Sequence, residues 1–122
     1  MDQHLGIHIL LVGDTARWRE QTKSALPAHY CIRVRSDYVG AIEALMEGPK
    51  FNLCIMANKI SERDDGLRIV QELQEDGDPH VILYTREISD HSRTQAEKLG
   101  AIVIDMGNTE ALCAAVKTLI EI

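Results

Sequence analysis

The sequence predicts a doubly wound α/β fold with five parallel strands and five helices. Short runs rich in branched apolar residues recur along the chain, at 7–12, 30–35, 51–56, 80–85 and 101–104. Each run is followed by capping residues and a stretch with helical character. Strict alternation of this kind places the strands parallel, with right-handed crossovers and helices on both faces of the sheet.

The first two runs differ in a way that predicts their place in the sheet. Residues 7–12 (Ile-His-Ile-Leu-Leu-Val) form a nearly continuous apolar run that Gly13 ends, as in a parallel strand buried on both faces. In 30–35, apolar residues alternate with Arg33 and Arg35. Two arginines on one face of a strand indicate a position near an edge of the sheet.

Capping residues mark where the predicted helices begin and end. Asp14 or Thr15 caps a helix that reaches Leu26 before Pro27. Three later helices have two candidate N-caps each: Ser36 or Asp37, Ser89 or Asp90, and Asn108 or Thr109. Two of these helices also have a clear stop, at Gly48-Pro49 and at Gly100. We therefore expect one domain that spans residues 1–122.

Charge and composition argue against several classes of function. The formal net charge is −6, whereas phosphate contacts to nucleic acid need clustered Lys and Arg, so we expect no nucleic-acid binding by this domain. No apolar run approaches the roughly 20 residues that span a bilayer, so we expect no membrane segment. The start of the chain lacks a signal-peptide pattern, and the three cysteines lie in apolar patterns. These features predict a cytoplasmic protein with reduced thiols.

Open α/β sheets place their functional groups at the carboxyl ends of the strands. With the flavodoxin-like strand order 2-1-3-4-5, that site lies at the ends of the first and third strands. The third strand delivers Ala57 and Asn58, of which neither is an acid, a nucleophile or a good metal ligand. A Gly-x-Gly-x-x-Gly fingerprint and a Walker A loop are both missing from the sequence.

Several short segments, taken in order, carry a resemblance to a known family. They are Ile9 to Val12 leading into Asp14, Phe51-Asn52-Leu53, Asp65-Gly66-Leu67, Val81 to Thr85, and Leu99-Gly100-Ala101. Over about 7–120 the chain resembles the receiver domain of two-component response regulators. The resemblance implies a pocket with a phosphoacceptor carboxylate after strand 3 and two acids after strand 1. These acids hold Mg²⁺, while a Thr or Ser after strand 4 and a Lys after strand 5 bind phosphoryl oxygens.

This sequence departs from that pattern at most of those places. Gly13-Asp14 stands where the acid pair is expected, and Met106-Gly107 stands near the place of the lysine. Counting forward from Phe51 puts Ala57 at the acceptor position, and counting back from Gly66 puts Asn58 there. Only Thr85 is kept. The degenerate pocket therefore comprises Gly13, Asp14, Ala57, Asn58, Thr85, Met106 and Gly107.

We accordingly expect no enzymatic activity, no catalytic residue, no metal site and no cofactor, Mg²⁺ included. The resemblance implies a partner or homodimer face on the fourth helix, fifth strand and fifth helix, with candidate residues Arg93, Lys98, Ile104, Leu112, Val116 and Leu119. The leading hypothesis is an atypical receiver-like signalling domain that acts through protein contacts without phosphorylation. One alternative is a conventional phosphoacceptor switch that uses a displaced acid, Asp64 or Asp65, with Mg²⁺. Another is a small-ligand flavodoxin-like binder or enzyme.

Overall fold

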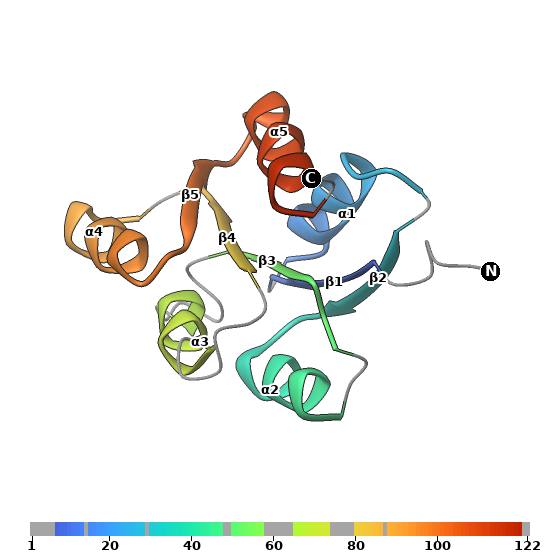
Figure 1. The fold of residues 1–122 in the computed structure, drawn as a ribbon, viewed down its shortest axis with the longest axis horizontal. Coiled ribbons are helices and arrows are strands. Elements are labelled where there is room, and N and C mark those ends of the chain that lie inside the picture. The colour runs from blue at the N-terminus through green and yellow to red at the C-terminus, as the bar shows by residue number, and fades with distance from the viewer. Residues whose placement is uncertain are drawn as a thin grey trace.

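Ten elements alternate along the chain in a computed structural model that describes residues 7–13, 15–28, 30–47, 50–57, 65–73, 80–86 and 88–120. The strands are β1 (His8–Val12), β2 (Cys31–Arg35), β3 (Leu53–Met56), β4 (His80–Thr85) and β5 (Ile102–Asp105). The helices are α1 (Ala16–Ser24), α2 (Tyr38–Glu47), α3 (Asp65–Leu73), α4 (Asp90–Lys98) and α5 (Thr109–Ile120). Figure 1 shows them arranged around a central twisted sheet.

All neighbouring strands pair in parallel, in the order β2-β1-β3-β4-β5. The predicted flavodoxin-like topology is confirmed. So is the position of β2 at an edge, which Arg33 and Arg35 indicated from their shared face. The register pairs Val12 of β1 with Met56 of β3. The residues that follow these two strands therefore reach the same edge of the sheet.

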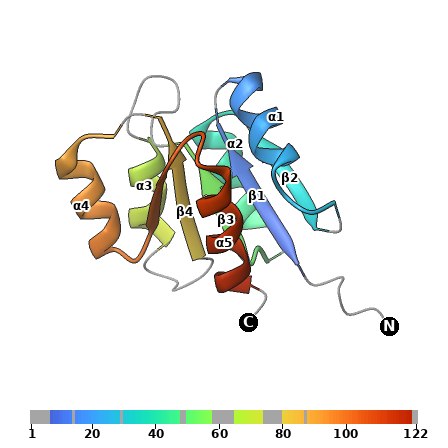
Figure 2. The ribbon, with the colours of Figure 1, turned by 90° about the horizontal axis from the view of Figure 1, so that it is seen from above.

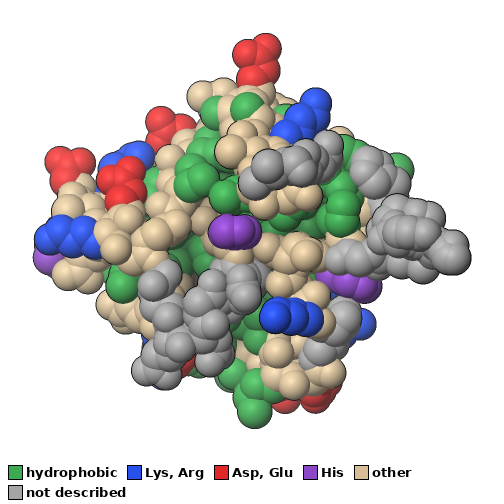
Figure 3. Space-filling view, viewed as in Figure 1, with side chains coloured by type: hydrophobic (Ala, Val, Ile, Leu, Met, Phe, Trp, Pro, Cys, Tyr) green, Lys and Arg blue, Asp and Glu red, His purple; other side chains and the backbone are tan. Residues whose placement is uncertain are grey.

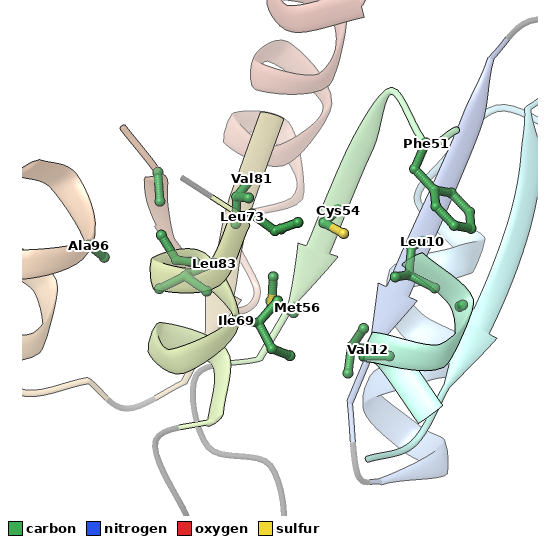
Figure 4. Packing of buried hydrophobic residues seen from close by; sticks show 14 residues of the cluster. Leu10, Val12, Phe51, Cys54, Met56, Ile69, Leu73, Val81, Leu83 and Ala96 are labelled. Carbon is green, nitrogen blue, oxygen red and sulfur yellow. The ribbon is translucent and has the colours of Figure 1, made fainter. Parts of the chain in front are cut away.

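The helices cover both faces of the sheet, α1 and α5 on one side and α2, α3 and α4 on the other (Figures 1 and 2). Alternate residues of the central strands point to opposite faces. Leu10, Cys54 and Leu83 pack toward α2, α3 and α4 (Figure 4), whereas Leu11 and Ile55 pack toward α1 and α5. Two apolar cores thus enclose one sheet, which explains why β1 and β3 are apolar along their whole length.

Side-chain hydrogen bonds identify the N-cap residue of α1, α2, α4 and α5. Thr15 Oγ1 accepts from Trp18 N, and Asp37 Oδ1 accepts from Gly40 N. Ser89 Oγ accepts from Ser92 N, and Asn108 Oδ1 accepts from Ala111 N. Asp14, the other candidate for the first helix, lies outside the described residues. Gly100 ends α4 with a φ of 96°, a left-handed conformation that suits glycine.

The structure corrects some predicted boundaries. Helix α1 ends at Ser24, two residues before the predicted Leu26, because Pro27 disfavours helical geometry in the residue before it. The N–H groups of Ala25 and Leu26 instead close tight turns onto Thr22 O and Lys23 O. Strand β5 lies one residue later than predicted, since Asp105 pairs with Thr85. Within the described ranges, we find no helix long and apolar enough to cross a membrane.

Candidate functional site

The described residues of the predicted pocket lie at the carboxyl edge of the sheet. Ala57 follows β3 directly, and its N–H donates to Val12 O at 3.0 Å. Thr85 ends β4, and its carbonyl oxygen accepts from Met106 N at 3.0 Å. The fold therefore brings Gly13, Ala57, Thr85 and Met106 to one edge. Asp14, Asn58 and Asp64 lie outside the described residues, as does the side chain of Asp65.

The described residues of this pocket offer few polar groups. Gly13 and Gly107 have no side chain, Ala57 has a methyl group, and Met106 has a thioether. The hydroxyl group of Thr85, a buried residue, is the one side-chain oxygen among them. Mg²⁺ binds through carboxylate and phosphate oxygens, so this part of the pocket does not fit it. Nor does the described part of the chain contain a group of three or more His, Cys, Asp or Glu residues that could hold a metal ion.

An aromatic ring fills the space beside Gly13. A Cβ atom on residue 13 would lie 2.8 Å from both Cδ2 and Cζ3 of Trp18, and nearer still to Cε3. Separations below 3 Å between such atoms require something to move, and the six-membered ring of an indole is not a flexible chain end. Any side chain at position 13, including an aspartate, is therefore incompatible with Trp18 in this place.

Two hydrogen bonds hold the backbone of Gly13 beside the ring. Its N–H donates to Arg35 O at 3.1 Å, and its carbonyl oxygen accepts from Arg19 Nη1 at 2.7 Å. The first bond ties Gly13 to the end of β2, and the second ties it to α1. These contacts fix Gly13 against Trp18.

Hydrogen bonds extend from Trp18 to the loop after β5. Trp18 Nε1 donates to Tyr84 O at 2.8 Å, and the Tyr84 hydroxyl oxygen accepts from Gly107 N at 3.0 Å. Trp18 and Tyr84 are both almost fully buried. The contact joins the start of α1 to β4 and then to the segment where the lysine was expected. Trp18 was not among the residues predicted for this pocket. The pairing of a glycine at the acid position with a tryptophan five residues later was the available signal.

The structure divides the six candidate residues of the interaction face. Arg93 lies on the surface, where its Nη2 is 3.2 Å from Asp105 Oδ1, and Lys98 is exposed. Figure 3 shows acidic and basic side chains intermixed over α4. Leu119 is half-buried. Ile104, Leu112 and Val116 are buried in the core between the sheet and α5. The expectation that all six lie on the face is therefore corrected for these three, because the apolar stripe of α5 packs onto the sheet and Ile104 of β5 belongs to the same core.

Comparison with solved structures places this geometry in a known fold. The chain is similar to a signal receiver domain of two-component signal transduction (histidine kinase) from Clostridium thermocellum, with a TM-score of 0.81, 18% identity, and 97% of this chain and 100% of that chain covered. It is also similar to a response regulator receiver protein from Pseudoalteromonas atlantica, with a TM-score of 0.82, 15% identity, and coverage of 93% and 97%.

A third similar structure is a CheY-like response regulator receiver domain protein from Methanospirillum hungatei JF-1, with a TM-score of 0.77, 19% identity, and coverage of 92% and 91%. Neither a protein-family model nor a curated protein sequence matches the chain. At these identities the likeness defines the fold, so the chain has the receiver-domain fold of two-component signalling.

Proposed function

We propose that this protein is an atypical receiver-like signalling domain that acts through protein–protein contacts and is not phosphorylated at the carboxyl edge of its sheet. The observation that carries the proposal is the packing of Trp18 over Gly13. In receiver domains, a carboxylate is expected at that place. Here a buried aromatic ring occupies it and leaves no room for a side chain on residue 13.

The register of β1 and β3 supports Ala57, rather than Asn58, as the residue at the acceptor position. Val12 pairs with Met56, so Ala57 follows β3 at the level where Gly13 follows β1. The N–H of Ala57 extends the same ladder by donating to Val12 O. A methyl group cannot attack phosphorus, because phosphoryl transfer to a protein needs a nucleophilic oxygen, nitrogen or sulfur atom. Asn58 would lack the anionic oxygen as well.

The proposed partner surface is formed by α4, β5 and α5, with a protein partner or a second copy of this chain as its occupant. Arg93, Asp105 and Lys98 make this face polar and of mixed charge. Mixed charges suit a transient interface, in which electrostatic complementarity sets specificity and association rate more than affinity. The pocket at the strand ends then serves the fold rather than a chemical switch.

Intact-mass measurement after incubation with acetyl phosphate and Mg²⁺ tests the proposal. We expect the unmodified mass, since no described pocket residue is a carboxylate. A stable added mass of about 80 Da, the signature of one phosphoryl group, would contradict it. Parallel runs with Asp64→Asn and Asp65→Asn identify the displaced-acid alternative, because one of these variants would then lose the added mass. Asp90→Asn, a change in the first turn of α4, is the matched control.

A further inference from the structure

A groove between α1 and the segments after β4 and β5 has no role in the proposed function. It has a volume of about 670 Å³, which lies in the range of small-molecule sites. One stripe of α1 forms its first wall through Arg17, Glu20, Gln21 and Ser24. Arg86, Met106, Gly107 and Thr109 form the opposite side, and Tyr84 also lines it. The groove shares Met106 and Gly107 with the degenerate pocket, but neither Ala57 nor Thr85 lines it.

Two arginine residues from different elements line this groove. Arg17 belongs to α1 and Arg86 follows β4, and both are exposed. In the described part of the chain, neither has a hydrogen-bond or ion-pair partner. Glu20 is the one acid among the lining residues, so the lining carries a net charge of +1 (two Arg minus one Glu) in a protein of net charge −6. Guanidinium groups bind phosphate oxygens through paired N–H donors.

The hydroxyl group of Tyr84 adds a donor to the same groove. Tyr84 is 4% exposed, and its hydroxyl oxygen accepts from Gly107 N. A phenol that accepts one hydrogen bond still has its own hydrogen to donate, and that hydrogen has no acceptor among the described residues. Because Tyr84 lines the groove, this hydrogen can be donated to an oxygen atom there, either of water or of a ligand.

Two backbone features favour an anion at this end of the groove. Gly107 has a φ of 102°, and a Cβ placed on it would meet no atom within 4 Å, so the approach to it is open. Helix α5 begins at Thr109, which lines the groove, and runs for 12 residues. The amino end of a helix carries a partial positive charge and N–H groups that point outward, of which that of Ala111 is already bound by Asn108 Oδ1.

We propose that this groove binds a phosphate-bearing small molecule, with Arg17 and Arg86 clamping the phosphoryl oxygens and the Tyr84 hydroxyl donating to one of them. The ligand is inorganic phosphate or pyrophosphate, or an organic phosphate such as a nucleotide. The inference is independent of how the protein signals.

Isothermal titration of the full chain with phosphate, pyrophosphate and ADP, at low and constant ionic strength, tests this site. We expect saturable binding of at least one of the three with a dissociation constant of about 1 mM or tighter. Equal affinities for pyrophosphate and ADP identify an inorganic ligand, and tighter binding of ADP identifies an organic phosphate.

Three variants and one control decide whether binding occurs in this groove. Arg17→Gln and Arg86→Gln each weaken binding roughly tenfold, because each removes a charge-assisted contact. Tyr84→Phe weakens it severalfold. Lys23→Gln, which removes the same charge from α1 outside this groove, leaves it unchanged. Failure of the wild-type protein to bind any of the three anions overturns the proposal. So does an equal loss in Lys23→Gln, or unchanged binding in both arginine variants.

Discussion

The indole nitrogen of Trp18 donates a hydrogen bond of 2.8 Å to the backbone oxygen of Tyr84, which lies 66 residues later in the chain. This bond crosses the carboxyl edge of the sheet from α1 to β4, and the ring that makes it covers Gly13. One side chain thus fills the space beside Gly13 and joins the elements around it.

Replacement of Trp18 by Phe tests the hydrogen bond separately from most of the packing. Phe keeps a six-membered ring near Gly13 but leaves Tyr84 O without this donor. A buried acceptor that loses its partner costs about 1–3 kcal/mol, and the smaller ring adds a packing loss. We expect the free energy of unfolding, measured in urea, to fall by about 2–4 kcal/mol. A change below about 0.5 kcal/mol would show that the bond does not contribute to stability.

The steric relation between Gly13 and Trp18 predicts a coupled effect of two substitutions. Gly13 does not have a left-handed φ, so Gly13→Ala strains no backbone dihedral, and its cost comes from the ring. We expect a loss of about 1–3 kcal/mol in the wild-type background. In a Trp18→Leu background, where the ring is gone, the same change costs less by at least about 1 kcal/mol.

A matched glycine on the opposite face of the sheet controls for general effects of adding a methyl group. Gly40 lies in α2, where an added Cβ meets Asp37 and Arg35 rather than Trp18. Gly40→Ala therefore changes stability equally in the two backgrounds. If Gly13→Ala also costs the same in both, Trp18 does not exclude a side chain at position 13.

The three cysteines differ in burial, which predicts their order of reaction with a thiol reagent. Cys31 is exposed, Cys113 is half-buried and Cys54 is fully buried. Burial raises the pKa of the Cys54 thiol to about 12, so almost none of it is thiolate near neutral pH. With Ellman's reagent at pH 8, Cys31 reacts first and Cys54 reacts only when the protein unfolds. Labelling of Cys54 at the rate of Cys31 would contradict its burial.

The same thiol predicts a loss of stability at alkaline pH. Because its folded-state pKa lies above the ordinary value of 9.0, its contribution is complete below pH 9 and is lost as the pH rises toward 12. The unfolding free energy then falls by up to about 1.4 kcal/mol per pH unit from this group. Cys54→Ala removes that slope, and titration of the other groups remains as the shared background. Identical slopes in the two proteins between pH 9 and 11 would refute the assignment.

The ion pair between Arg93 and Asp105 should contribute little to stability, although it lies on the proposed partner face. The side chain of Asp105 is 77% exposed, so water and salt screen the pair. We expect Arg93→Gln to change the unfolding free energy by less than about 1 kcal/mol. A larger loss would mean that the pair supports the fold and not only the surface.

Periodicity and caps were enough to predict the architecture. The five apolar runs became the five strands, Arg33 and Arg35 marked the edge strand, and Gly100 ended a helix as its type suggested. The exact ends shifted because they depend on local competition, as when Pro27 turns the chain after Ser24. These shifts are of one or two residues and leave the sheet order unchanged.

For the site, the sequence predicted which chemical groups are absent but not which side chain lies beside Gly13. Residue type alone shows that Gly13 and Ala57 carry no carboxylate, whereas the resemblance implies acids at those positions. What replaced them depended on contacts between distant segments, and no local pattern showed that Trp18 would reach Tyr84. The prediction of the interaction face was wrong in part for a related reason. Leu112 and Val116 belong to an apolar stripe of α5, and such a stripe does not indicate whether it packs on the sheet or on a partner.

The central claim is that the pocket at the carboxyl edge of the sheet takes no phosphoryl group. A titration with beryllofluoride and Mg²⁺ tests this claim most directly. Beryllofluoride mimics a phosphoryl group on a carboxylate, so binding reports a working acceptor site without waiting for turnover. We expect the backbone amide signals of Gly13, Ala57, Thr85 and Gly107 in ¹H–¹⁵N spectra to stay in place at every concentration. Saturable shifts of these four signals that require both beryllofluoride and Mg²⁺ would contradict the account.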